Sequence, residues 1–201
     1  MVRQVLLRGG LTAETSSAGE AVNRITRQMG GLSACRTFRL PGVRKLLAHS
    51  PGADNWDNVI STIEDEGSFS KYGNIHGTAA DVFRRLLEKG VFRAGLKMQC
   101  PGCNIRSPYE PEDLATEVRC PRCGTTFLLA PRLETSHWEY RASGFFAHHR
   151  EHGAIPVILT MLRLEHDLKE RALFLVPSQK LLGDGVDCES DFVAMHQRNG
   201  G

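Results

Sequence analysis

Two short cysteine brackets limit what this chain can fold into more than any other feature of its sequence. They are Cys100-Pro101-Gly102-Cys103 and Cys120-Pro121-Arg122-Cys123, with sixteen residues between them. A Cys-x-x-Cys turn places two thiolates on the same side of a tight loop, so two facing turns can surround one ion with four sulfur ligands. The spacing therefore predicts a structural Zn²⁺ site with the ligands Cys100, Cys103, Cys120 and Cys123. Two disulfides or a redox-active pair are the alternatives, and both are disfavoured because nothing in the sequence indicates secretion.

A zinc ribbon is expected around this site. Residues 116–119 lead into the second bracket and residues 125–129 leave it, with the β-branched and apolar side chains typical of antiparallel strands. Gly124 follows the bracket directly and permits the positive φ with which the chain turns away from a metal. A module of this size has little core of its own, so metal binding should supply much of its folding free energy, on the order of 10 kcal/mol.

Charge is balanced over the whole chain but not along it. The 201 residues include 25 Lys or Arg and 23 Asp or Glu, so the net charge of +2 indicates no class of partner. Residues 1–50, however, hold eight basic residues against two acidic ones, among them Arg36, Arg39 and Arg44. Such an excess fits a phosphate-facing surface, which makes nucleic acid, DNA first, the expected partner; a solvated helix face is the alternative. Protein partners and a homo-oligomer stay open.

No segment of the sequence indicates export or membrane insertion. The apolar run at the start is interrupted by Arg3 and Arg8, and no later stretch reaches the length that spans a membrane. We therefore expect a cytoplasmic protein without membrane contact. Cys35 and Cys188 lie outside the brackets and are expected to be reduced and to fill a core as small apolar side chains.

The expected fold class is α+β, with three parts: a basic, helical, winged-helix-like region over residues 1–98, the ribbon over 99–131, and helices plus a β-hairpin over 132–201. The best-defined helix runs from Thr78, a capping residue, to Lys89, with Asp81 in its first turn and Gly90 at its end. A strand over residues 91–98 follows it into the first bracket.

The last part combines helical and strand-like patterns. Helical periodicity is present over residues 138–151 and again over residues 157–166. Strands are expected over residues 172–182 and 186–195, and Asp184-Gly185 between them is a strong hairpin signal. His148 and His152 stand one helical turn apart, where a polar helix face is favoured over a second metal site.

The second of these strands carries acidic residues at every other position. Asp187, Glu189 and Asp191 should therefore share one face, because alternate side chains of a strand point the same way. Three carboxylates on one face repel one another unless water or a cation relieves them, so Mg²⁺ at Asp191 is a sensible partner. An exposed, solvated strand face is the plainer interpretation.

Residues 138–147, 153–162 and 189–194 together resemble the front half of the PD-(D/E)XK, or restriction-endonuclease-like, nuclease superfamily. The resemblance implies a core of helix, strand, strand and strand, with an acid on the helix, an Asp in the second strand and a Glu-x-Lys in the third. It matches Asp191 to the second-strand Asp, lets Glu189 assist it, and makes Glu139 the helix acid, with Glu165 as a competitor.

The resemblance departs from the family after Asp191, because no Glu-x-Lys follows it in this sequence. We therefore expect a fragment of a Mg²⁺-dependent, phosphodiester-hydrolysing nuclease of a bacterial defence or restriction system, without cleavage activity in these 201 residues. The alternative function is that of a non-enzymatic zinc-ribbon adaptor or DNA-binding regulator, in which the last strands only complete a core.

Overall fold

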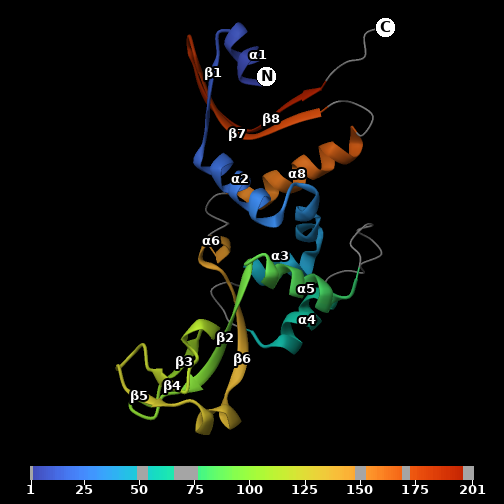
Figure 1. The fold of residues 1–201 in the computed structure, drawn as a ribbon. Coiled ribbons are helices and arrows are strands. Elements are labelled where there is room, and N and C mark those ends of the chain that lie inside the picture. The colour runs from blue at the N-terminus through green and yellow to red at the C-terminus, as the bar shows by residue number, and fades with distance from the viewer. Residues whose placement is uncertain (1, 49–53, 66–76, 148–152, 169–172, 197–201) are drawn as a thin grey trace. The chain divides into compact units, whose positions relative to one another are not determined.

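A computed structural model describes residues 2–48, 54–65, 77–147, 153–168 and 173–196 (Figure 1). Contacts between Cα atoms divide the chain into two compact units. The first unit, residues 1–39 and 148–201, is built from both ends of the chain, and the second consists of residues 40–147. This division differs from the boundaries at residues 98 and 131 that the sequence suggests, since the helix at residues 79–88 and the cysteine ribbon belong to one unit.

The first unit is a three-stranded antiparallel sheet with helices packed against it. Its strands lie in the order β1-β7-β8, and helices α2 and α8 pack against each other and against β7. The elements are α1 (Val2–Arg8), β1 (Thr12–Thr15), α2 (Ser17–Met29), the 3-10 helix Ser33–Arg39, α8 (Ala154–Asp167), β7 (Leu173–Gly183) and β8 (Val186–His196). Helix α8 and the two long strands are those that the sequence pattern predicts.

Helices α2 and α8 supply most of the core of this unit. Val22 and Ile25 of α2 and Ile158 and Leu162 of α8 are all buried, in the i, i+3 or i, i+4 spacing of one helix face. Cys35 of the 3-10 helix is buried as expected, and burial raises the pKa of its thiol to about 12, so it stays protonated.

The hairpin of β7 and β8 confirms the turn signal in the sequence. Gly183 pairs with Val186, so Asp184-Gly185 is a two-residue loop, and Gly185 has the positive φ of 72° that such a loop needs. Figure 1 shows the two strands side by side along their length. Cys188 on β8 is exposed, so the expectation that it fills a core is wrong.

The second unit contains two small sheets and four helices among its described residues. A three-stranded antiparallel sheet has the order β3-β2-β6, and β4 pairs with β5 in a separate ribbon. The helices are α3 (Pro41–Ala48), α4 (Trp56–Asp65), α5 (Ala79–Glu88) and α6 (Gly144–Ala147), with 3-10 helices at Pro111–Asp113 and Ala130–Thr135. The strands are β2 (Phe92–Gln99), β3 (Arg106–Tyr109), β4 (Glu117–Arg119), β5 (Thr126–Leu128) and β6 (His137–Ala142).

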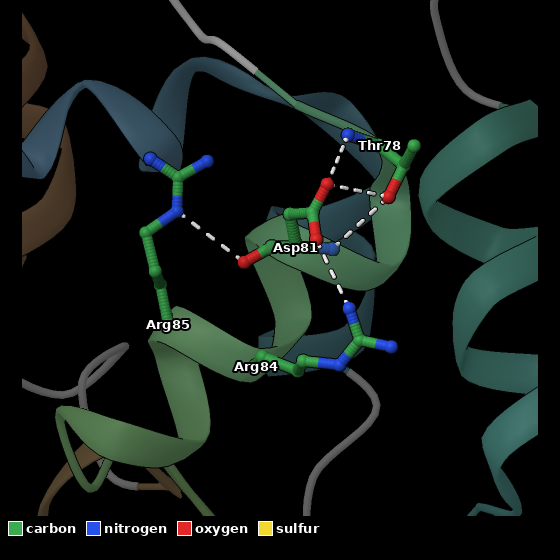
Figure 2. Close-up of polar contacts among 4 residues, drawn as sticks. All are labelled: Thr78, Asp81, Arg84 and Arg85. Atoms are coloured by element: carbon green, nitrogen blue, oxygen red, sulfur yellow. Dashed lines mark hydrogen bonds and ion pairs between the residues drawn. The ribbon is translucent and has the colours of Figure 1, made fainter.

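Helix α5 begins with the cap that the sequence predicts. The Thr78 hydroxyl accepts from the Asp81 backbone N–H at 3.2 Å, and the Asp81 carboxylate accepts from the Thr78 N–H at 2.8 Å. Figure 2 shows this reciprocal pair, with Arg84 3.0 Å from the carboxylate and Arg85 donating to the Asp81 carbonyl. The backbone hydrogen bond from Thr78 lowers the pKa of Asp81.

An aromatic cluster joins α4, α5 and the sheet. Phe83 of α5 stands edge-on to Trp56, Phe92 and Tyr140, with ring centroids 5.2–5.5 Å apart. Such pairs are worth about 0.5–1.5 kcal/mol each beyond the buried area. Phe83 is fully buried, so it is the centre of this packing.

One predicted helix is wrong. Residues 137–142 form strand β6 instead, followed by the short helix α6, while residues 148–152, with His148 and His152, lie outside the described structure. Strand β6 pairs with β2 from Phe92–Ala142 to Lys97–His137, and Tyr140 also bridges to Asp54. Aromatic residues favour strands, and partners 40 to 50 positions away along the chain override the local helical periodicity.

The chain is therefore of the mixed α+β class, as the sequence predicts. None of the helices that the structure describes combines the length and the apolar character needed to cross a membrane.

Candidate metal centre

The two cysteine brackets form the turns of two hairpins. Residues 100–105, the first knuckle, connect β2 to β3, and residues 120–125, the second knuckle, connect β4 to β5. The metal centre therefore lies between two separate sheets of the second unit.

Both knuckles have the same backbone hydrogen bonds. In the first, Cys100 donates to the Ile105 carbonyl at 3.1 Å and accepts from the Asn104 N–H at 2.9 Å. In the second, the corresponding bonds join Cys120 to Thr125 and Gly124, each at 2.9 Å. The sequence repeat thus becomes a structural repeat, which presents each pair of sulfurs in the same way.

Left-handed residues end both knuckles. Gly124 has φ 76°, as its place in the sequence predicts, and Asn104 takes the same role with φ 62°. Asn is the residue other than Gly that tolerates this conformation best. Asn104 was not predicted from the sequence, although its position one residue after Cys103 matches that of Gly124 after Cys123.

The four sulfur atoms converge. All of them lie within 4.8 Å of one another. The Sγ atoms of Cys100 and Cys123 are 3.6 Å apart, and those of Cys103 and Cys120 are 3.9 Å apart. A tetrahedron with Zn–S bonds of about 2.3 Å has edges of about 3.8 Å. The cluster therefore has the size of a four-sulfur zinc site, and all four cysteines are free thiols, not the disulfides of the alternative interpretation.

The backbone around the second knuckle favours thiolates. Hydrogen bonds from the N–H groups of Cys123 and Arg122 lower the pKa of Cys120 to about 6 against the opposing effect of burial. The Thr125 hydroxyl, 3.2 Å from the sulfur, and the Thr125 backbone lower the pKa of Cys123. Thiolates are the form that binds metal, so these two ligands are prepared for it.

Cys103 of the first knuckle holds its proton more strongly. The Ile105 backbone N–H favours the thiolate of Cys103, but burial and the three neighbouring sulfurs together raise its pKa to about 11. Four thiolates so close together repel one another unless a cation balances them. Binding of a divalent metal should therefore displace the proton of Cys103.

A small apolar core supports the knuckles. It consists of Leu96, Met98, Cys100, Tyr109, Val118, Cys120 and Phe127, with Cys103, Leu114 and Leu129 packed against it. The rings of Tyr109 and Phe127 meet edge to face at 6.1 Å. Burial, and next the sulfur of Cys120, raise the pKa of the Tyr109 hydroxyl above its usual range. The core joins both sheets, since its residues come from β2 and β3 on one side and β4 and β5 on the other.

The acidic face of β8 is present but does not form a metal cluster. Asp187, Glu189 and Asp191 are all exposed, and Asp187 lies 3.4 Å from Lys180 of β7. Alternate residues of a strand are about 6.6 Å apart along the chain. In the part of the chain that the structure describes, the cysteine cluster is the only group of three or more Cys, His, Asp or Glu close enough to share a metal. This geometry therefore does not support a Mg²⁺ site at Asp191.

Glu139 does not lie on a helix, so its predicted role as the helix acid is wrong. It lies on β6, where its carboxylate is 2.6 Å from the Lys97 ammonium and 3.2 Å from the His137 ring. Its side chain is 11% exposed, so the ion pair with Lys97 is largely shielded from water. Glu139 belongs to the second unit, whereas Glu189 and Asp191 belong to the first.

Glu165, the competing candidate, does lie on a helix. It is exposed on α8, with its carboxylate 3.9 Å from Arg36. Arg39 donates to the Leu162 carbonyl of the same helix at 3.0 Å. Two of the three basic residues singled out for phosphate contact thus have partners within the first unit.

Comparison with protein-family models, with curated proteins and with solved structures found no match to this chain. The arrangement of the four sulfurs therefore carries the functional argument.

Proposed function

We propose that the chain is a zinc-binding protein whose four-cysteine centre has a structural role. The observation that carries this proposal is the pair of cross-knuckle sulfur distances, 3.6 and 3.9 Å, which match the edges of a zinc–sulfur tetrahedron. Four protein ligands fill the coordination of the metal, so no position is left for a reacting water. Closed sites of this kind stabilise folds, whereas catalytic zinc sites keep one position open.

The metal would connect two hairpins that otherwise share a small apolar core. Strands β4 and β5 are three residues long, and β3 is four. Such short ribbons are marginal in water without further packing. One ion bound to Cys100 and Cys103 at one turn and to Cys120 and Cys123 at the other would tie both ribbons to a shared core.

Metal content tests the proposal directly. The purified chain should contain one zinc per molecule, measured by elemental analysis, and Cys123→Ser should lose it. Cys188→Ser is the matched control, because that cysteine is also exposed but lies on β8 outside the cluster. A wild-type chain that takes up no transition metal under reducing conditions would refute the structural zinc site.

A finer proposal is that the chain acts on nucleic acid. In this proposal residues 154–196 are the front half of a PD-(D/E)XK-like nuclease core, and the ribbon and the winged-helix-like leader position a DNA partner in the cytoplasm of a bacterium, as part of a defence system. Support comes from the order α8, β7, β8, which is the helix, strand, strand order of that superfamily, with Asp191 on the second strand. Glu165 then replaces Glu139 as the helix acid. A complete site would need a Glu-x-Lys strand, which this sequence does not contain.

A DNA-binding measurement distinguishes a nucleic-acid-binding protein from a protein-binding adaptor. A chain that binds nucleic acid should bind duplex DNA with an affinity that falls steeply as the salt concentration rises. The slope of log affinity against log salt concentration should become shallower when Arg106 and Arg122, both exposed on the ribbon, are changed to Gln. Glu112→Gln and Glu117→Gln, exposed on the same ribbon, are controls that should leave the slope unchanged. Absence of salt-dependent binding, together with retained zinc, would favour a protein-binding adaptor.

A further inference from the structure

Two buried hydroxyl groups on strand β3 have no hydrogen-bond partner in the described structure. They belong to Ser107 and Tyr109, whose exposed fractions are 3% and 2%. The two residues are two positions apart on a strand, so they lie on the same face. Buried hydroxyls without a partner are rare in folded proteins because each forfeits its bonds to water. Each of the two hydroxyls therefore needs a hydrogen-bond acceptor.

The ring of Tyr109 is held firmly inside the ribbon. Tyr109 pairs with Leu96 across β2 and β3, and its ring meets Phe127 of β5 at an interplanar angle of 87°. All three residues belong to the buried core that also contains Cys120. The polar atom at the tip of this ring consequently faces an environment of carbon and cysteine sulfur.

The cysteine sulfurs are the acceptors in the buried cluster that holds Tyr109, and Cys120 is among them. After burial, the neighbouring Cys120 sulfur is the largest cause of the raised pKa of the Tyr109 hydroxyl. A neutral thiol is a weak acceptor, but a thiolate accepts a charge-assisted bond that is about twice as strong as a neutral one. Cys120 also receives N–H bonds from Cys123 and Arg122 of its own knuckle, so a bond from Tyr109 would add a third donor to its sulfur.

We propose that Tyr109 is a positioning residue of the metal centre, whose hydroxyl donates a hydrogen bond to the Cys120 thiolate when the four cysteines hold a metal. This inference rests on the proposed zinc site. The bond would orient the Cys120 side chain and withdraw charge from its sulfur, which relieves repulsion among four thiolates. It would also satisfy the buried hydroxyl, so metal binding and the packing of β3 would stabilise each other.

Cobalt provides a spectroscopic test in the full chain. Tyr109→Phe removes one oxygen and keeps the ring that packs on Phe127. We expect its Co²⁺ affinity to fall about tenfold or more, as for other outer-shell changes. The sulfur-to-cobalt charge-transfer band should move to lower energy, because a thiolate that loses a hydrogen bond gives up its electrons more easily. Ser107→Ala is the matched control: it also removes a buried, unpartnered hydroxyl from β3 but should leave the band in place.

A second measurement requires no variant. In the wild-type chain loaded with an NMR-active cadmium isotope, the Tyr109 hydroxyl proton should exchange slowly and show scalar coupling to cadmium through the Cys120 sulfur. The proposal would be overturned if Tyr109→Phe left the charge-transfer band and the Co²⁺ affinity unchanged, or if it shifted them only as much as Ser107→Ala does. A Tyr109 hydroxyl proton that exchanges fast and shows no coupling to cadmium would also overturn it. A wild-type chain that binds neither cobalt nor cadmium would instead refute the zinc site itself.

Discussion

The Sγ atoms of Cys100 and Cys123 lie 3.6 Å apart, although the two residues are 23 positions apart in the sequence. Cys103 and Cys120 form the complementary pair at 3.9 Å. The first cysteine of each knuckle thus faces the second cysteine of the other. Each knuckle supplies two of the four ligands, so the complete site forms only when the fold brings both knuckles together.

Removal of the metal should unfold the ribbon before the rest of the molecule. Structural zinc contributes on the order of 10 kcal/mol, and the strands around the site are short. With a chelator, hydrogen exchange should become fast in β4 and β5. The β7–β8 hairpin, which is eleven residues long on each side and belongs to the other unit, should keep its protection. Equal loss of protection in both hairpins would contradict a local structural role.

Metal affinity should rise with pH across the neutral range. Cys120, with a pKa lowered to about 6, is already a thiolate at pH 7, whereas Cys103, with a pKa raised to about 11, still holds its proton. Metal binding at pH 7 should therefore release at least one proton, and affinity should fall further as pH drops through 6 and protons compete for Cys120. Calorimetry in buffers of different ionisation enthalpy counts the protons, and a count of zero at pH 7 would contradict this assignment.

Gly102→Ala should weaken the metal site. A Cβ at Gly102 would collide with the side chain of Thr125, whose hydroxyl contacts the Cys123 sulfur. Overpacking of this kind costs about 1–3 kcal/mol and would push the knuckles apart. Gly144→Ala is the control, since a Cβ there meets nothing within 4 Å. Competition with a chromogenic chelator should show weaker zinc binding for the first variant alone.

Thr78→Ala should destabilise the second unit through its helix cap. The change removes the bond to the Asp81 N–H and typically costs about 1 kcal/mol. Thr160→Ala, whose hydroxyl donates to a carbonyl within α8, serves as control and should cost little. Because the Thr78 backbone bond lowers the pKa of Asp81, this cap stabilises the fold above the ordinary Asp pKa and weakens as pH falls below it. Thermal unfolding at neutral and acidic pH measures both effects.

Substitutions at Lys97 and Glu139 should show that their ion pair stabilises the fold. Lys97→Met leaves a largely shielded carboxylate without its ammonium partner, with only the His137 ring 3.2 Å away. It should cost about 1–2 kcal/mol, less than in a fully buried pair because the Lys97 side chain is 33% exposed. The double change Lys97→Met with Glu139→Gln should recover most of that loss. Denaturant unfolding of the single and double variants gives the coupling, and additive losses would show that the two residues act independently.

Local signals in the sequence determined several elements. The two brackets predicted the four converging sulfurs, since a Cys-x-x-Cys turn fixes its own pair of ligands. The capping residues Thr78 and Asp81 predicted the start of α5, and Asp184-Gly185 predicted the turn between β7 and β8, because caps and tight turns depend on φ, ψ and hydrogen bonds within a few residues. Gly124 was predicted for the same reason.

The tertiary structure alone decided what depends on distant partners. Residues 137–142 have an ambiguous pattern, and pairing with β2 makes them a strand, which removes Glu139 from a helix and places it against Lys97. The joining of the chain's two ends in one unit has no local signature, because long-range contacts create it. That the Tyr109 hydroxyl is buried without a hydrogen-bond partner likewise follows only from its surroundings in the fold. Burial, and with it the need for a hydrogen-bond partner, is a property of the packed fold and not of a short stretch of sequence.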